Sequence, residues 1–89
     1  MSRSTFSYLN CHKQTVIVET DLKDGQRVTI KVSGYECEII SVYALNHDPI
    51  NVMSGGVYFD AVIKRGKYPN DVGRICKNIP ERNIDKILN

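Results

Sequence analysis

The sequence predicts a small, mainly β domain, built as an antiparallel barrel or a strongly bent sheet with a short C-terminal helix or 3₁₀ turn. The chain has 89 residues, of which 42% are hydrophobic and 25% are charged, so it holds enough apolar material for one globular core. Short stretches rich in β-branched residues alternate apolar and polar side chains, as half-buried strands do. These stretches follow one another closely with no helical pattern between them, which favours antiparallel pairing.

The chain begins with a polar, non-periodic segment over residues 1–12. We expect this segment to form a loose or late-ordered arm ahead of a single β-rich domain over residues 13–89. Residues 15–20 are β-branched almost throughout and predict the first strand. Asp24-Gly25 then predicts a turn, because this dipeptide tolerates the positive φ angles that tight turns require.

The clearest strand covers residues 26–32. One face should be buried there, because three β-branched residues alternate with polar ones: Val28, Ile30 and Val32. A second long strand is expected over residues 35–45, and its alternation changes phase at Ile39-Ile40. Such a change predicts a β-bulge or sharp bend, which a small barrel needs in order to close.

The second half of the chain continues in the same manner. Residues 46–56 predict a long loop that contains Asp48-Pro49 and two consecutive glycines. Residues 57–64 alternate again and predict a third long strand. A turn over residues 65–71 should lead into a fourth strand over residues 72–77.

The C-terminal segment predicts a short helix or 3₁₀ turn. Pro80 suits the first turn of a helix, and Asn78 stands where a capping residue is expected. Further apolar residues recur at helical spacing, namely Ile84, Ile87 and Leu88.

Several elements of residues 25–88 occur in an order typical of one small fold. They are the Val28-x-Ile30-x-Val32 strand, Gly34 at its end, the bent strand over 36–43, the strand over 57–64 and the turn Ile79-Pro80-Glu81-Arg82-Asn83-Ile84. With these elements residues 25–88 resemble an SH3-like small β-barrel of the KOW and Tudor sort. The resemblance implies a fold whose members bind RNA, DNA or protein segments, and the fold alone does not choose among these partners.

The charge is unevenly distributed along the chain, although its formal total is only +2. Residues 19–60 hold seven acidic residues against three basic ones, whereas residues 61–78 hold five basic residues against one acidic residue. Cations neutralise phosphates, and a tyrosine ring offers a base a surface on which to stack. The sequence therefore predicts a non-catalytic nucleic-acid-binding module, with RNA slightly favoured over DNA. The expected binding residues are Lys64, Arg65, Lys67, Tyr68, Arg74 and Lys77.

Protein binding is the alternative function: a small phage-type accessory protein that binds and inhibits or redirects a host protein. Ten Ile and seven Asn against two Ala fit either an AT-rich source, such as a phage, or the preference of a small β-rich protein for Ile. Two surfaces could serve this function. One is acidic and could mimic phosphates, through Asp21, Asp24, Glu36, Glu38 and Asp48. The other is an apolar strand face with Ile40, Val42, Val62 and Ile50.

Enzymatic activity, a metal and a cofactor are not expected. The adjacent pairs Cys11-His12 and His47-Asp48 lack the spacing of structural zinc ligands, and Cys37 and Cys76 are expected to act as small buried apolar residues. No nucleophile elbow, paired-carboxylate spacing or phosphate-cradling glycine loop is present.

The three cysteines form an odd set without a CxxC pair, which fits reduced thiols in the cytoplasm. No apolar run approaches the length of a membrane span, and the first ten residues lack the apolar stretch of a secretory signal. No membrane association is expected. The oligomeric state is open, because an edge strand such as residues 15–20 could pair with a second copy.

Overall fold

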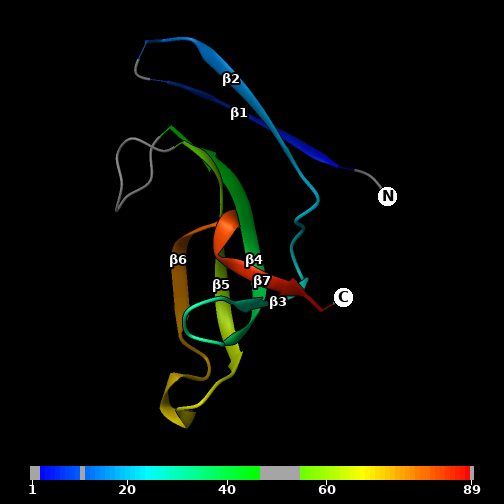
Figure 1. Cartoon of the computed structure of the whole chain (residues 1–89), viewed down its shortest axis with the longest axis vertical. Helices are drawn as coiled ribbons and strands as arrows, with labels where there is room; N and C mark the ends of the chain where they lie inside the picture. The colour runs from blue at the N-terminus through cyan, green and yellow to red at the C-terminus, as the bar shows by residue number, and fades with distance from the viewer. Residues whose placement is uncertain (1–2, 11, 47–54, 89) are drawn as a thin grey trace.

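A computed structural model describes residues 3–10, 12–46 and 55–88, and it has the predicted mainly β, antiparallel architecture. The strands form a two-stranded hairpin and a five-stranded sheet with the order β6-β5-β4-β3-β7 (Figure 1). The strands are β1 (Ser4–Leu9), β2 (Thr15–Thr20), β3 (Arg27–Ile30), β4 (Glu36–Leu45), β5 (Gly56–Arg65), β6 (Ile75–Pro80) and β7 (Ile84–Ile87). Two 3₁₀ turns, η1 (Pro69–Asp71) and η2 (Glu81–Asn83), lie on either side of β6.

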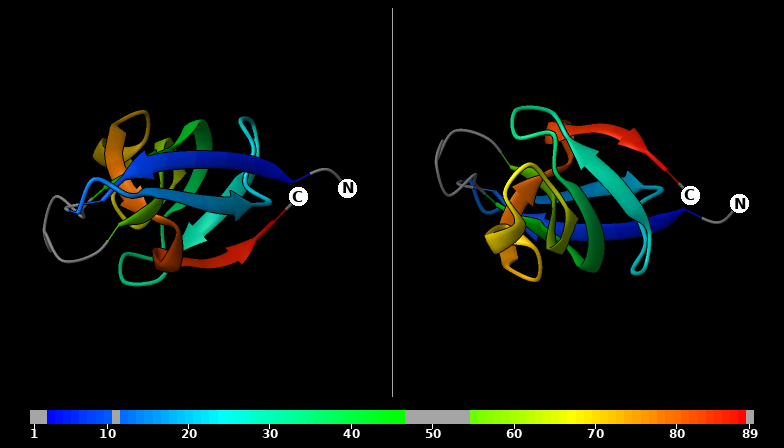
Figure 2. Two further views of the ribbon diagram at one scale, coloured as in Figure 1. Left: turned by 90° about the horizontal axis from the view of Figure 1, so that it is seen from above. Right: turned by 90° about the horizontal axis from the view of Figure 1, so that it is seen from below.

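Strands β3 to β6 form a meander in which each strand pairs with the next one along the chain. After β6, the η2 turn redirects the chain so that β7 pairs with β3. Within the described chain β6 and β7 are the outer strands of this sheet, so it is a strongly bent open sheet and not a closed barrel. Figure 2 shows its strands curling around a common interior.

The predicted β-bulge in the second long strand is confirmed. Pairing between β4 and β5 shifts register between Ile39 and Ser41, which leaves Ile40 without a partner opposite it. Cys37 and Ile39 are buried before the shift, and Val42 packs against the core after it. The extra residue therefore keeps apolar side chains on the inner face while the strand bends.

A single apolar cluster fills the interior of the bent sheet. It includes Phe59, which is fully buried at the middle of β5, and the part-buried Val18 of the hairpin packs against it. Removing this apolar surface from water is the main favourable contribution to folding. The buried members are Leu22, Val28, Cys37, Ile39, Val57, Phe59, Ala61 and Ile63.

The β1–β2 hairpin was not expected, because residues 1–12 were predicted to be a loose arm. Phe6 and Tyr8 lie on the half-buried side of β1, and Thr5 and Ser7, which alternate with them, face solvent. The Asn10 side chain accepts backbone hydrogen bonds from His12 and Gln14, each at 2.9 Å, and so closes the turn. The hairpin lies across one end of the bent sheet (Figures 1 and 2).

Two expectations at the start of the larger sheet need correction. The strand predicted over residues 26–32 ends at Ile30, and Val32 lies in the following turn with 98% of its surface exposed. Gly34, with a φ of +71°, donates its N–H to the Ile30 carbonyl at 2.8 Å and reverses the chain there. The turn at Asp24-Gly25 is confirmed, but the strands that it connects, β2 and β3, do not pair with each other.

The fourth predicted strand, over residues 72–77, begins and ends later than expected, because β6 runs from Ile75 to Pro80. The 3₁₀ turn is confirmed at Glu81–Asn83, whereas the helical interpretation of the next residues is wrong. Ile84 and Ile87 belong to β7, where a bulge places them opposite Ile30 and Val28. Because of this bulge, Ile84 and Ile87 lie on the same face although they are three residues apart, a spacing that is typical of a helix.

Most of the loop predicted over residues 46–56, including Asp48-Pro49, lies outside the described residues, as do Cys11, His47 and Ile50. No helix in residues 3–10, 12–46 or 55–88 is long and apolar enough to cross a membrane.

Candidate functional site

The six predicted binding residues lie along the connection between β5 and β6 and on the two strand ends beside it. We name residues 64–77 the basic connection. Figure 1 places it at the opposite end of the molecule from the β1–β2 hairpin. All six residues are exposed: Lys64 and Arg65 at the end of β5, Lys67 and Tyr68 in the bend, Arg74 just before β6, and Lys77 within β6.

Backbone hydrogen bonds bring the two arms of the basic connection together. Ile63 donates to the Arg74 carbonyl at 2.9 Å, and Gly73 donates to the Ile63 carbonyl at 2.7 Å. Gly73 has a φ of +93°, a conformation that residues with a side chain rarely adopt. This pairing places Arg74 beside Ile63, the residue of β5 that directly precedes Lys64.

An aromatic ring and a cation lie next to each other at the tip. The ammonium nitrogen of Lys67 lies 5.7 Å from the centre of the Tyr68 ring, within the range of a cation–π contact. The Tyr68 side chain is 57% exposed, so its ring is open to a ligand. The tip thus offers a positive charge and a stacking surface together.

Tyr35, at the end of the turn between β3 and β4, fastens the basic connection. Its hydroxyl donates a hydrogen bond to Asp71, and Arg74 approaches the same carboxylate at 3.1 Å. These two contacts, first that of Tyr35 and then that of Arg74, lower the pKa of Asp71. The Tyr35 ring also packs on Gly66, where a Cβ atom would lie only 2.5 Å from a ring carbon.

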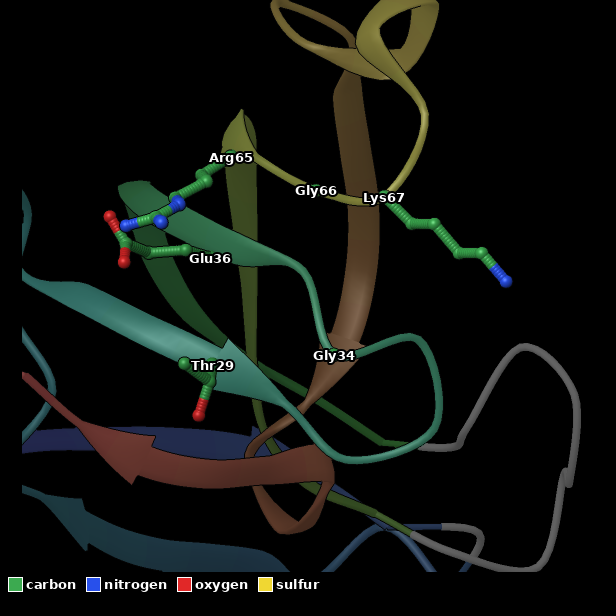
Figure 3. Close-up of a pocket in the computed structure, with 6 residues that line it drawn as sticks. All are labelled: Thr29, Gly34, Glu36, Arg65, Gly66 and Lys67. Atoms are coloured by element: carbon green, nitrogen blue, oxygen red, sulfur yellow. The ribbon is translucent and has the colours of Figure 1, made fainter.

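A hollow of about 330 Å³ opens beside the basic connection and is lined by Thr29, Gly34, Glu36, Arg65, Gly66 and Lys67 (Figure 3). Figure 3 shows the guanidinium group of Arg65 and the carboxylate of Glu36 directed toward one another, while Lys67 points away from both. Glu36 also accepts a hydrogen bond from Arg27 at 3.0 Å. Glu36 thus lies beside Arg65 but forms its ion pair with Arg27.

Arg74 differs from the other basic residues of the connection, because it forms an ion pair with Asp71. Across the residues that the structure describes, no ion pair involves Arg65 or the three lysines, Lys64, Lys67 and Lys77. These residues carry the charge that is available to a ligand.

A polar cluster fixes the backbone next to Lys77. Asn78 has a φ of +57°, and its N–H donates to the Tyr43 hydroxyl at 3.0 Å and to an Asp60 oxygen at 3.1 Å. The Tyr43 hydroxyl donates to that Asp60 oxygen at 2.6 Å. Burial, followed by the hydrogen bond to Asp60, raises the pKa of Tyr43 to about 12. The pairing of β5 with β6 shifts register here, because two residues of β6, Lys77 and Asn78, lie opposite Asp60 alone. The cluster therefore stabilises this bulge in β6.

The acidic residues considered for phosphate mimicry are dispersed. Asp21 approaches Arg3 at 3.1 Å near the hairpin, whereas Glu36 and Glu38 both lie beside Arg27, at 3.0 and 4.0 Å. Asp48 lies outside the described residues. Asp21, Glu36 and Glu38 thus have basic neighbours in two separate regions, and Asp24 lies in the turn before β3.

The apolar residues predicted for a partner face do not all lie on one exposed face. Val42 packs against the core, so its place on an exposed face is wrong, and Ile50 lies outside the described residues. Ile40 is 44% exposed, while Val62 is half-buried.

The described residues contain no group of three or more His, Cys, Asp and Glu side chains that could hold a metal ion. Cys37 is buried, and Cys76 is half-buried. Burial, with smaller effects from Cys76 and Glu36, raises the pKa of Cys37 to about 11.

The site is shaped by four residues to which no sequence pattern assigned a part in positioning the basic connection: Tyr35, Gly66, Asp71 and Glu36. Tyr35 and Asp71 are 36 positions apart, so no local pattern connects them. The one available signal was the lone acid among five basic residues in the segment 61–78. Neither a protein-family model nor a curated protein nor a solved structure matches this chain significantly.

Proposed function

We propose that this protein is a non-catalytic nucleic-acid-binding module that holds single-stranded RNA, or DNA with a slightly weaker preference, along its basic connection. The observation that carries the proposal is the exposed Tyr68 ring with the Lys67 ammonium group beside it. Single strands expose unpaired bases that stack on aromatic rings, while their phosphates attract cations.

The balance of charge at the site supports a phosphate-bearing ligand. Five basic residues lie on the basic connection, and in the described chain Glu36, Asp60 and Asp71 are acidic residues close to them. Because three lysines have no ion pair among the described residues, they can exchange small counterions for phosphates.

The order of the strands supports the proposed resemblance to a family of small binding domains. A four-strand meander, followed by η2 and a last strand that returns to β3, is consistent with the proposed resemblance to SH3-like small barrels. That resemblance implies binding of RNA, DNA or protein segments, and the charge of this site favours the first two.

We also propose a cytoplasmic location, because free thiols such as those of Cys37 and Cys76 stay reduced there.

Fluorescence anisotropy with labelled single-stranded RNA, single-stranded DNA and duplex DNA tests the proposal. We expect the single strands to bind more tightly than the duplex, and binding to weaken as salt rises. The variant carrying Lys64→Gln and Lys67→Gln should bind several-fold more weakly across all sequences, as loss of phosphate contacts predicts.

A matched control removes the same charge elsewhere. Lys13→Gln with Lys86→Gln alters two exposed lysines in the hairpin turn and in β7. This control should bind like the unaltered protein. Equal losses in both double variants would show that only net charge matters and would contradict the assigned site.

Binding of a host protein is the second candidate, and exposed apolar side chains favour it. Ile75 in β6 is 59% exposed, and Val72 and Ile40 are also exposed. Because an apolar interface depends little on salt, an affinity for a captured protein that is unchanged by salt, without nucleic-acid binding, would favour this candidate.

A further inference from the structure

We propose that a second hollow, between the turn after β3, strand β6 and η2, seats one base of the strand that the basic connection binds. This inference rests on the proposed function and specifies how that site would take a base. The hollow has a volume of about 240 Å³ and lies beside the site, because Tyr35 and Lys77 both line it.

The walls of this hollow suit a flat, weakly polar group. Ile30, Cys37, Ile79 and Pro80 supply apolar surface, and Tyr35 adds an aromatic ring. Pockets for drug-sized ligands begin at about 300 Å³, so this hollow fits a single ring system and not a larger molecule.

The edge of the hollow favours a nucleotide over an apolar amino-acid side chain. Ser33, Lys77 and Asn83 border it, and none of the residues that line it is acidic. Hydroxyl and amide groups can bond the polar edge of a base, while Lys77 attracts its phosphate. The one charged residue that the described chain places in the lining is thus complementary to a polyanion.

The surrounding contacts hold the hollow in shape before a ligand arrives. Asp71 accepts the hydrogen bond of the Tyr35 hydroxyl, and the Tyr35 ring rests on Gly66. Across the opening, Asn78 lines the hollow and is held by Tyr43 and Asp60. A preformed site loses little conformational entropy when a base enters it.

Cys76 offers a direct report on occupancy, because it lines the hollow and is half-buried. The experiment measures its alkylation by iodoacetamide in the full protein, with peptide mass spectrometry to score each cysteine separately. The probes are oligothymidylate and a length-matched abasic strand, and anisotropy measures the affinity of each. We expect oligothymidylate to slow alkylation of Cys76, the abasic strand to leave it unchanged, and the abasic strand to bind at least about fivefold more weakly.

A pair of variants tests the hollow itself. Cys76→Leu should fill it and remove the advantage of oligothymidylate over the abasic strand, whereas Cys76→Ala should keep that advantage. Circular dichroism checks that both variants fold. If one variant does not fold, the alkylation of Cys76 in the unaltered protein is the deciding measurement.

The possible failures are distinguishable. Equal affinities for the two strands with unprotected Cys76 would overturn the base site and leave phosphate binding intact. Binding of neither strand at low salt would overturn the proposed function and this inference with it. Protection of Cys76 by a leucine-rich peptide but not by oligothymidylate would assign the hollow to a protein ligand and overturn the proposal.

Discussion

The left-handed backbone of Asn78 gives the sharpest test of how the site is built. Asn78 follows Lys77, has a φ of +57°, and donates its N–H to Tyr43 and Asp60. We predict that Asn78→Ala destabilises the protein more than Asn78→Gly does. Both variants lose the amide group, whose local hydrogen bonding lets asparagine tolerate this conformation, but only alanine keeps a Cβ atom there.

The expected magnitude follows from two contributions. A left-handed alanine costs about 1–2 kcal/mol relative to glycine. Loss of the Asn78 amide oxygen costs up to about 0.5–1.5 kcal/mol, because the single proton of the Tyr43 hydroxyl has two acceptors at 2.6 Å, this oxygen and Asp60. Glycine avoids the first cost but gives up about 0.4–1 kcal/mol through its freer unfolded chain. Asn78→Ala should therefore lose up to about 1.5–3.5 kcal/mol and be the less stable variant by roughly 0.5–1 kcal/mol.

Thermal unfolding followed by circular dichroism measures this difference. In a domain of this size, 1 kcal/mol moves the melting temperature by about 4–8 °C, so the two variants should be resolved. An alanine variant as stable as the glycine variant would refute the left-handed conformation and the bulge that depends on it.

Three further predictions concern the anchoring of the basic connection and the core. Gly66→Ala should reduce nucleic-acid affinity several-fold, because the added Cβ displaces the Tyr35 ring; Gly55→Ala, with a comparable clash outside the site, should leave the affinity measured by anisotropy unchanged. In Tyr35→Phe, carbon NMR should show the pKa of Asp71 rising toward its ordinary value, and an unchanged pKa would argue against the hydrogen bond. Because that pKa is lowered in the folded protein, the stability that Asp71 contributes is present above about pH 4 and is lost as the pH falls through the folded-state pKa. Burial raises the pKa of Cys37 to about 11, so iodoacetamide at pH 8 should modify it only after unfolding, and rapid modification of the folded protein would contradict its burial.

The sequence predicted the parts of the fold that depend on local alternation. The phase change at Ile39-Ile40 correctly placed the bulge in β4, because one extra residue leaves a visible mark on a pattern of period two. Phe6 and Tyr8 carry the same alternation in β1, but the serines around them hid it in a segment that reads as polar.

Long-range pairing could not be predicted in the same way. Ile84 and Ile87 have helical spacing in the sequence, and only their partners in β3 show that a bulge produces it. Val32 continues the alternation of its strand, yet Gly34 turns the chain and leaves Val32 in solvent.

The candidate site was predictable in its charge but not in its geometry. The six residues chosen from the sequence are all exposed near one end of the sheet. The six residues differ in their acidic neighbours, because other parts of the fold supply these: Glu36 faces Arg65, and Asp71 binds Arg74. No local pattern could show that Arg74 forms an ion pair while, in the described chain, the three lysines of the basic connection do not.

The dependence of single-stranded RNA affinity on salt tests the central claim most directly. If Lys64, Lys67 and Lys77 each contact one phosphate, the logarithm of the association constant should fall with the logarithm of salt concentration with a slope of about −2, a loss of roughly twentyfold between about 50 and 200 mM salt. Replacing any one of these lysines with glutamine should make the slope shallower by about 0.7. A slope near zero, or one that the three replacements leave unchanged, would contradict phosphate binding by the basic connection.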